Sequence, residues 1–256
     1  MIHPTAIIDP SCELANDVRV GAYAIIGPDV RIDSGTEIGP HAVIKGPTRI
    51  GKHNRIFQFA SVGEDPQDKK YHGEVTYLDI GDRNVIREYV TIHRGTVQDQ
   101  GTTRIGDDNL LMAYTHVAHD CVIGSHVIMA NAASLAGHVR VDDYAILGGF
   151  SLVHQFCKIG QHSFSAMGSV ITRDILPYVM VGGCPTKPHG INTVGLERQG
   201  FNPESIRQIR KAYKTVYKSR LKLDEAIQQL DEMTSETPEI QKMVDFLKQT
   251  GRSIIR

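Results

Sequence analysis

Hydrophobic side chains recur along most of the chain with a period of six residues. An aliphatic residue stands at every sixth position across residues 2–62 and 80–92. After a shift of one residue the series resumes across 105–171, where Ser165 is the one exception. A six-residue unit with one inward apolar side chain buries little by itself, whereas stacked units bury a continuous column. The period therefore predicts a solenoid built of hexapeptide repeats.

Hexapeptide repeats with small residues near the corners are typical of a left-handed parallel β-helix, in which three repeats make one coil of about 18 residues. This hand is an exception to the right-handed rule for parallel strand connections. About nine coils at the ~4.8 Å spacing of paired strands give a prism roughly 45 Å long. The repeat fails near 63–79 and 94–104, so we expect two inserted loops there. The predicted mainly β domain covers residues 1–190.

After the repeat ends, the hydrophobic spacing changes to three and four residues, which is typical of helices. Asn202 followed by Pro203 predicts a helix start, with Asn as the N-cap and Pro in the first turn. Further starts at 223–225 and after Pro238 predict three short helices in all. We expect a small helical C-terminal region over residues 191–256.

The overall composition narrows the class of protein. The chain has 256 residues and a formal net charge of −1, so a general nucleic-acid-binding surface is not expected. Its N-terminus lacks the basic and apolar segments of a signal peptide, and about 18 consecutive apolar residues occur nowhere. We therefore expect a cytoplasmic protein without a membrane span. The lack of any C-x-x-C spacing predicts free thiols at Cys12, Cys121, Cys157 and Cys184.

Histidines cluster in the predicted β-helix and mark a candidate active site. All 12 histidines precede residue 190. An 18-residue coil stacks two columns side by side: His119, Gly137 and Gln155 in one, and Asp120, His138 and Phe156 in the other. His119 can serve as a general base near neutral pH, which is typically worth a factor of about 10² to 10⁴ in rate. Asp120 can fix its tautomer, and the unobstructed N–H of Gly137 can donate to a developing oxyanion.

Three other interpretations of these residues remain open at this point. A zinc site of the γ-class carbonic anhydrase type would use His93, His116 and His119, although the H-x-x-H spacing differs from that family's pattern. A trimeric solenoid scaffold with exposed histidines and basic helices would need no chemistry at all. A cysteine nucleophile is disfavoured, because Cys121 takes an inward position of its repeat and buried thiols are inert. The polar column around His119 is what favours an enzyme over a scaffold.

Four strings of the sequence closely resemble those of one enzyme family. They are HVAHDC at 116–121, GDRNVIREYVTIHRGT at 81–96, the segment 148–156 and GLERQGF at 195–201. Together they resemble the UDP-N-acetylglucosamine O-acyltransferases, hexapeptide-repeat enzymes that open lipid A biosynthesis, over essentially the whole chain. The resemblance implies a cytoplasmic homotrimer with active sites between subunits.

The same resemblance implies the reaction. In it, a 3-hydroxyacyl group passes from acyl carrier protein to the glucosamine 3-hydroxyl of UDP-N-acetylglucosamine. No metal is implied, and no cofactor beyond the phosphopantetheine that arrives on the carrier protein.

Roles for individual residues also follow from the resemblance. It implies His119 as general base, Asp120 as its orienting partner and Gly137 as oxyanion donor. Other family positions in the substrate cleft correspond to Asp68, Lys70, His93, His116, His138, His154, Gln155, Asn192 and Arg198. Met167 stands where family members that select long acyl chains have Gly, which implies a shorter 3-hydroxyacyl donor here. Gln199 replaces a frequent second basic residue, so phosphate or carrier contacts are expected to be weaker there.

A basic stripe on the first predicted helix is the candidate binding site for the acidic carrier protein. Residues 203–222 carry seven Lys or Arg side chains against one Glu. Spacings of three and four residues bring together Arg207, Arg210, Lys211, Lys214 and Lys218. Charge alone fits a solvated helix face equally well, and the resemblance favours carrier binding.

Overall fold

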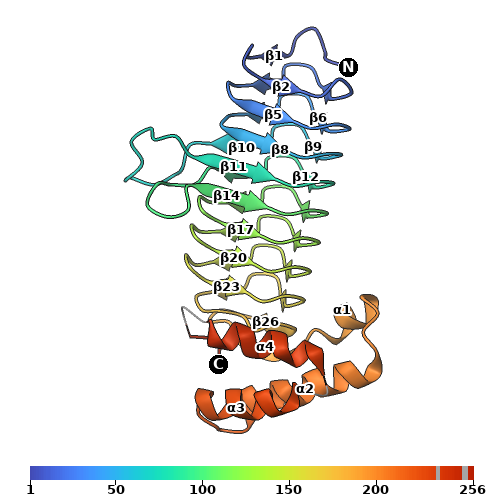
Figure 1. The fold of residues 1–256 in the computed structure, drawn as a ribbon, viewed down its shortest axis with the longest axis vertical. Coiled ribbons are helices and arrows are strands. Elements are labelled where there is room, and N and C mark those ends of the chain that lie inside the picture. Colours follow the sequence, from blue (N-terminus) through green and yellow to red (C-terminus); the bar gives the residue numbers. More distant parts are fainter. Residues whose placement is uncertain (235–236, 250–252) are drawn as a thin grey trace.

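The computed structural model of the chain describes residues 1–234, 237–249 and 253–256. These residues form a long prism of stacked coils with helices packed at its C-terminal end (Figure 1). Three sheets make the three faces of the prism, and the chain passes from one face to the next through short turns. The fold is the left-handed parallel β-helix that the hexapeptide period predicted.

We number the sheets in chain order and give the strands found within the described residues. The first sheet contains β1 (Ile7–Ile8), β4 (Ile25–Ile26), β7 (Val43–Ile44), β10 (Ser61–Glu64), β13 (Thr91–His93), β16 (His116–Val117), β19 (Ser134–Leu135), β22 (Leu152–Val153) and β25 (Val170–Ile171). The second contains β2 (Glu13–Leu14), β5 (Val30–Ile32), β8 (Thr48–Ile50), β11 (Tyr77–Ile80), β14 (Thr102–Ile105), β17 (Val122–Ile123), β20 (Arg140–Val141) and β23 (Lys158–Ile159). The third contains β3 (Arg19–Val20), β6 (Glu37–Ile38), β9 (Arg55–Ile56), β12 (Val85–Ile86), β15 (Leu110–Leu111), β18 (Ile128–Met129), β21 (Ile146–Leu147), β24 (Phe164–Ser165), β26 (Val179–Gly182) and the antiparallel β27 (Lys187–Ile191).

The inward side chains of the repeats form one continuous core. In uninterrupted coils the strand register repeats every 18 residues, as where His116 pairs with Ser134. Inward residues such as Leu111 are fully buried. Ser165, the exception in the aliphatic series, is buried too, and its hydroxyl is satisfied by the Ser151 hydroxyl at 2.8 Å. The prism has three edges, which we name by the sheets that they join: the 1–2, 2–3 and 3–1 edges.

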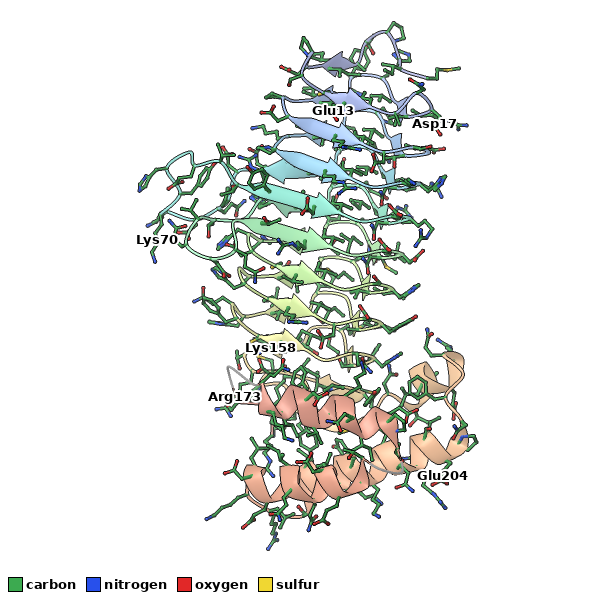
Figure 2. The ribbon with its side chains drawn as sticks, in the orientation of Figure 1. Glu13, Asp17, Lys70, Lys158, Arg173 and Glu204 are labelled. Atoms are coloured by element: carbon green, nitrogen blue, oxygen red, sulfur yellow. The ribbon has the colours of Figure 1, made fainter. Side chains whose placement is uncertain are left out.

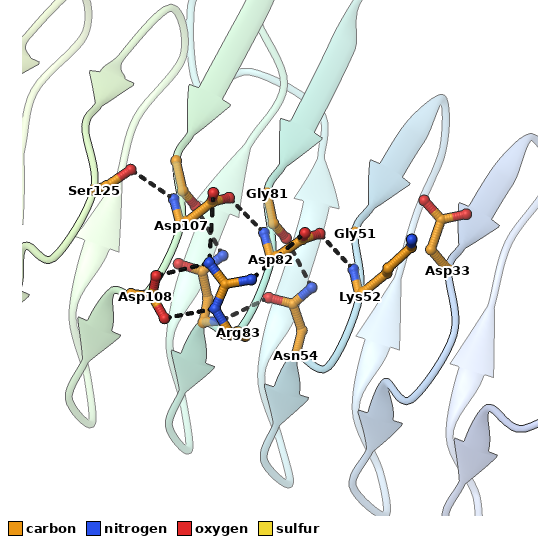
Figure 3. Close-up of polar contacts among 12 residues, drawn as sticks. Asp33, Gly51, Lys52, Asn54, Gly81, Asp82, Arg83, Asp107, Asp108 and Ser125 are labelled. Carbon is orange, nitrogen blue, oxygen red and sulfur yellow. Dashed lines mark hydrogen bonds and ion pairs between the residues drawn. The ribbon is translucent and has the colours of Figure 1, made fainter.

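Polar side chains tie neighbouring coils together at the 2–3 edge. Asn54, Asn84 and Asn109 each donate from Nδ2 to a glycine carbonyl of the next coil, at 2.8 to 2.9 Å. At the same edge, the carboxylates of Asp82 and Asp107 each accept a backbone N–H of the preceding coil at 2.7 Å (Figure 3). These contacts join the coils from which the two insertions leave the prism, so they hold the register where the repeat is interrupted.

Both insertions leave the prism at the 1–2 edge. The first spans 65–76 between β10 and β11, and the second spans 94–101 between β13 and β14. Both loops are shorter than the intervals expected from the sequence, because flanking strands take up the outer residues. The first insertion, which carries Lys70, projects well beyond the prism (Figure 2). The turn that contains His119 lies at the same edge, one coil further along.

Four helices follow the prism within the described residues: α1 (Thr193–Arg198), α2 (Pro203–Lys218), α3 (Leu223–Met233) and α4 (Pro238–Lys248). The starts of α2, α3 and α4 agree with the sequence analysis, and Asn202 caps α2 by accepting the Ser205 N–H at 2.8 Å. The short helix α1 was not predicted, because six residues carry no recognisable apolar period. No helix in this part of the chain is long and apolar enough to cross a membrane.

The outward side chains differ between the three faces. Those of the second sheet are mostly charged: Glu13, Arg31, Arg49, Asp79, Arg104, Arg140 and Lys158. Figure 2 labels Glu13 and Lys158 among them. Those of the third sheet form a half-buried apolar row from its middle onward: Val85, Leu110, Ile128, Ile146, Phe164 and Met180. The first sheet is apolar at both ends, with Ile25, Val43, Leu152 and Val170 around a polar middle. One face is therefore suited to solvent and two are suited to contacts with other surfaces.

Candidate active site

The turn between β16 and β17 carries His119 and Asp120 at the 1–2 edge. Asp120 has a φ of 59°, the left-handed conformation that the second residue of these turns adopts and that Asp tolerates better than most residues. Its backbone N–H donates to Oγ1 of Thr103 at 2.8 Å. The turn is therefore held to the adjacent coil through its backbone.

His119 and Asp120 form a hydrogen-bonded dyad. Nδ1 of His119 lies 2.9 Å from Oδ2 of Asp120, whose side chain is 0% exposed. Burial alone would raise the pKa of Asp120, but hydrogen bonds from His119 and Thr96 together outweigh burial and hold the pKa below its ordinary value. Asp120 is therefore a carboxylate at neutral pH and can only accept hydrogen bonds. Nδ1 of His119 carries the proton, and Nε2 keeps the lone pair that a general base needs.

Gly137 makes room for the His119 ring. A Cβ atom on residue 137 would lie 2.5 Å from Cε1 and 2.7 Å from Nε2 of His119. The N–H of Gly137 has no acceptor within the described residues. His138 donates its backbone N–H to the His119 carbonyl at 3.1 Å, and Phe156 donates to the Gly137 carbonyl at 3.2 Å. These contacts confirm the predicted stacking of the two columns.

His138 stands beside the dyad and contacts the second insertion. Its ring is nearly perpendicular to that of His119, with centroids 5.0 Å apart, and it stacks on Phe156 at 4.4 Å. Nδ1 of His138 lies 2.7 Å from Oδ2 of Asp99, a residue that the sequence analysis did not single out. His154 and Gln155 are exposed one coil beyond Gly137. The dyad is therefore part of a polar strip along the 1–2 edge.

His93 and His116 form a second histidine pair on the first sheet, with ring centroids 5.3 Å apart. Nδ1 of His93 is 2.6 Å from the Asp65 carbonyl oxygen, so that nitrogen carries the proton. Nδ1 of His116 is 2.7 Å from the Thr91 hydroxyl. Burial lowers the pKa of both histidines, to about 4 for His116. Both rings are therefore neutral at pH 7.

The first insertion carries Asp68 and Lys70 and is fixed to the prism by Arg94. Asp68 is half-buried and accepts the Lys70 N–H at 3.0 Å, whereas the Lys70 side chain is exposed. The buried guanidinium of Arg94 contacts the Asp65 carboxylate, and its Nη2 donates to the Tyr71 hydroxyl at 3.2 Å. The periodicity did not point to Arg94, because it lies in an insertion where the repeat stops.

Other predicted site residues lie at different edges of the same chain. Asn192 caps α1 and donates from Nδ2 to the His162 carbonyl at 3.0 Å, at the 2–3 edge. Arg198 is exposed in the last turn of α1. Met167 is 81% exposed in the turn before β25, at the 3–1 edge. A single chain does not bring these three side chains to His119.

The basic side chains predicted on α2 are all exposed: Arg207, Arg210, Lys211, Lys214 and Lys218. Arg210, Lys214 and Lys218 line a groove of about 310 Å³ that also borders β27. Nη2 of Arg210 donates to the Thr193 hydroxyl at 3.1 Å. The groove gives the basic stripe an apolar floor that includes Tyr213.

The zinc interpretation is not supported by the arrangement of the histidines. Within the described residues, the one group with ligand atoms close enough for a metal is His119, Asp120 and His138, all within 4.8 Å of one another. Asp120 is already hydrogen-bonded to His119 and Thr96, and Nδ1 of His138 to Asp99. These donors and acceptors fit a hydrogen-bonded dyad better than a cation site.

Cys121 fits no nucleophilic role, as expected. It is fully buried, and burial raises the pKa of its thiol to about 12. A thiol of this pKa supplies almost no thiolate at neutral pH. Cys12, Cys121 and Cys184 are free thiols.

The residues around His119 are arranged for proton transfer beside a hydrogen-bond donor. Nε2 of His119 can accept a proton from a hydroxyl group, and the Gly137 N–H can donate to an oxygen that gains negative charge. Such a pair suits nucleophilic attack by an alcohol on an acyl group.

Comparisons with known proteins agree with this chemistry. A family model described as UDP N-acetylglucosamine O-acyltransferase, domain 2, matches residues 174–255. A model of the bacterial transferase hexapeptide, in six repeats, matches residues 102–137. The acyl-(acyl-carrier-protein)–UDP-N-acetylglucosamine O-acyltransferase of Pseudomonas paraeruginosa is 58% identical over 256 residues, which cover 100% of this chain and 99% of that protein.

Solved structures match the prism and the helices together. LpxA from Acinetobacter baumannii superposes with a TM-score of 0.98 at 50% identity, covering 100% of this chain and 99% of that one. The UDP-N-acetylglucosamine O-acyltransferase from Moraxella catarrhalis gives a TM-score of 0.98 at 46% identity, with the same coverage.

Proposed function

The chain belongs to the family of acyl-(acyl-carrier-protein)–UDP-N-acetylglucosamine O-acyltransferases, and we propose that His119 is the general base of its reaction. The enzyme moves a 3-hydroxyacyl group from acyl carrier protein to the glucosamine 3-hydroxyl of UDP-N-acetylglucosamine, in lipid A biosynthesis. The observation that carries the assignment of the base is the His119 ring, bonded to a buried carboxylate and packed on Gly137.

The reaction proceeds through one tetrahedral intermediate. Nε2 of His119 takes the proton of the sugar 3-hydroxyl while that oxygen attacks the thioester carbonyl. The Gly137 N–H donates to the oxyanion that forms. As the carbon–sulfur bond breaks, His119 returns the proton to the departing phosphopantetheine thiolate. Asp120 holds the ring and stabilises the imidazolium between the two steps.

The sugar nucleotide binds along the 1–2 edge, where both insertions project. Asp68 and Lys70 contact it from the first insertion. The remaining cleft residues on this edge and on the first sheet are His93, His116, His138, His154 and Gln155. Neutral rings at His93 and His116 offer hydrogen bonds to hydroxyl groups without adding charge.

The active enzyme is a homotrimer with its sites between subunits. The apolar outward rows of the first and third faces support such contacts. A contact of the first face with the third face of the next subunit joins two different surfaces, and such contacts can close into a ring. With the 3–1 edges innermost, the 1–2 edge that carries His119 meets the neighbour's 2–3 edge, where Asn192 and Arg198 lie. The acyl chain then lies between the two apolar faces and ends at Met167.

Acyl carrier protein docks on the basic stripe of α2 and delivers its phosphopantetheine with the substrate. The reaction needs no metal and no other cofactor, and we place it in the cytoplasm. The scaffold interpretation has lost its basis, because the chain belongs to an enzyme family.

Mass spectrometry of the products tests this function. The wild-type enzyme is incubated with UDP-N-acetylglucosamine and a panel of 3-hydroxyacyl carrier proteins, with and without a chelator. We expect an O-acylated sugar nucleotide in both cases and a loss of about 10³-fold in His119→Ala. His53→Ala is the matched control, because His53 also packs on a glycine, Gly35 of the preceding coil, but lies at the 2–3 edge. Absence of product from every donor, or undiminished turnover in His119→Ala, would overturn the proposal.

A further inference from the structure

The second insertion holds Thr96 in a fixed position. Tyr77 of β11 accepts the Gly95 N–H at 3.1 Å and donates its own N–H to the Gly101 carbonyl at 2.8 Å. Inside the loop, the Thr96 carbonyl accepts the N–H groups of Asp99 at 3.2 Å and Gly101 at 3.0 Å. Thr96 is 1% exposed. Its backbone is therefore defined by bonds at both ends of the loop.

Thr96 makes three of the contacts of the Asp120 carboxylate. Its N–H donates to Oδ1 at 3.0 Å and to Oδ2 at 3.1 Å, and its hydroxyl donates to Oδ2 at 2.6 Å. Oδ2 is the same oxygen that His119 contacts through Nδ1. The hydroxyl of Thr96 and the imidazole of His119 thus share one carboxylate oxygen.

We propose that Thr96 is a positioning residue of the reaction, which acts on His119 through Asp120 and extends the dyad to Thr96–Asp120–His119. The proposal rests on the function proposed above, because it requires His119 to be the base. Thr96 touches neither substrate nor reacting atoms in this scheme. Its role is to fix the rotation of the Asp120 carboxylate, and with it the direction of the His119 lone pair.

A competing partner explains why this fixing is needed. Nδ1 of His138 lies only 3.9 Å from Oδ2 of Asp120, so a rotated carboxylate has a second histidine within reach. The same loop occupies that nitrogen with Asp99 at 2.7 Å. Thr96 keeps the Asp120 carboxylate hydrogen-bonded to His119, while Asp99 keeps His138 away from that carboxylate. The segment 94–101 therefore selects which histidine the buried carboxylate orients.

Substitution of the hydroxyl tests the proposal. Thr96→Val keeps the backbone donors and the shape but removes Oγ1, so we expect kcat to fall by about 10- to 100-fold. KM for both substrates should change less than about twofold, because binding groups are untouched. Thr96→Ser restores the hydroxyl and should regain most of kcat. Thr96→Ala, which adds no methyl group to the loop, serves if Thr96→Val does not fold.

A matched control exists one coil away. Thr115 is also fully buried, and its hydroxyl has no hydrogen-bond partner within the described residues. Thr115→Val should leave kcat unchanged. A fall in kcat equal to that of Thr96→Val would show that removal of a buried threonine hydroxyl is enough by itself, and would overturn the proposal.

A double-mutant cycle separates positioning from a general effect on the loop. If Thr96 acts through Asp120, Thr96→Val has no further effect on kcat once Asp120 is Ala. Multiplicative losses in the double variant would overturn the proposal, as would wild-type kcat in Thr96→Val. Full activity in His119→Ala would instead refute the proposed base, whatever the Thr96 variants do, so the two failures are distinguishable.

Discussion

In the proposed mechanism, Gly137 has two separable functions at the scale of single residues. The missing side chain leaves space for the His119 ring, and the free N–H offers a hydrogen bond to the oxyanion. An alanine at this position keeps the N–H and removes only the space. The two functions can therefore be tested one at a time.

We predict that Gly137→Ala lowers kcat by at least about tenfold. The new Cβ would lie 2.5 Å from Cε1 of His119 and displace the ring, and a displacement of about 1 Å can cost on the order of 10² in rate. Steady-state kinetics measure the change, and circular dichroism checks the fold. Gly27→Ala is the control, since its Cβ would meet nothing closer than the Ile44 carbonyl at 3.5 Å. Wild-type kcat in Gly137→Ala would contradict the packing of His119 on residue 137.

Met167 is predicted to set the length of the acyl chain. Its thioether fills groove volume that glycine would leave open, and each buried methylene is worth about 0.8 kcal/mol. The wild type should prefer a shorter 3-hydroxyacyl donor. Met167→Gly should raise kcat/KM for a donor two methylenes longer by on the order of tenfold relative to the shorter donor. Gln58→Gly, at the same turn position near the N-terminal end of the 3–1 edge, should not change the preference. An unchanged ratio in Met167→Gly would show that another residue limits the chain.

The site could be predicted from the sequence only where the coils are regular. The 18-residue coil predicts that His119 packs on Gly137, and the structure confirms it. Arg94, Thr96 and Asp99 were missed, because they lie in an insertion that changes the interval between stacked residues. His116, for example, contacts Thr91 across 25 residues rather than 18. No fixed period predicts contacts made by such a loop.

At the scale of elements, stacked rings support the turns between strands. His162 and Tyr144 adopt φ values of 54° and 60°, a conformation that costs non-glycine residues energy. Along the 2–3 edge, ring centroids of Tyr144 and His162 are 4.7 Å apart, and those of His162 and Tyr178 are 5.8 Å apart. Stacking of aromatic rings offsets part of the cost of these turns.

This stack predicts a pH dependence of stability. Burial lowers the pKa of His162 to about 4, whereas an unfolded histidine has a pKa near 6.5. The unfolded state binds more protons between these values, so the free energy of unfolding falls as pH drops from about 6.5 to 4. His162→Phe keeps the stacked ring but cannot titrate.

Thermal unfolding at pH 7 and pH 5 measures this effect. The Tm of His162→Phe should fall less between the two values than that of the wild type. Tyr144→Phe, in the same stack, should behave like the wild type because it leaves His162 in place. Parallel Tm curves for His162→Phe and the wild type would contradict the lowered pKa.

Helix α2 supplies a second prediction at this scale. Reversing Arg210 and Lys211 to Glu should raise KM for the acylated carrier protein about tenfold at low salt, with little change in kcat, because charges at the rim of an interface act mainly on association. The effect should shrink as salt shortens the range of the interaction. Lys52→Glu combined with Lys242→Glu changes the net charge equally at exposed positions away from α2. Equal KM values for the two double variants would refute carrier binding by α2.

Among the elements, the long regular ones were predictable and the short irregular one was not. The inward aliphatic period predicts the stacked strands, and the N-cap at Asn202 predicts the start of α2. Helix α1 has one buried residue, Leu196, so its sequence shows no periodic pattern of apolar residues. It is held instead by its Asn192 cap, which also bonds to the His162 carbonyl.

At the scale of the whole molecule, the prism has one charged face and two faces with apolar rows. The six-residue period of the inward side chains did not predict this division, because the outward side chains form continuous faces only when the coils are stacked. The predicted site residues are divided in the same way among the three edges. His119 lies at the 1–2 edge, and Met167 lies at the 3–1 edge. Arg198 lies in α1, which begins at the 2–3 edge. This division supports the proposal that a complete site combines residues of two subunits.

Mixed trimers test whether each site combines residues of two subunits. One variant, His119→Ala, lacks the base, and the other, Arg198→Glu, repels the anionic substrate from the neighbouring edge. The two differently tagged chains are produced together, and mixed trimers are purified through both tags and assayed for acyl transfer. If each site combines His119 of one subunit with Arg198 of the next, one of the three sites in every mixed trimer is complete. The purified mixed trimers should then regain about a third of wild-type activity, although each parent is nearly inactive. Activity in the mixed trimers no higher than that of the parents would show that both residues act within one chain, and would rule out sites shared between subunits.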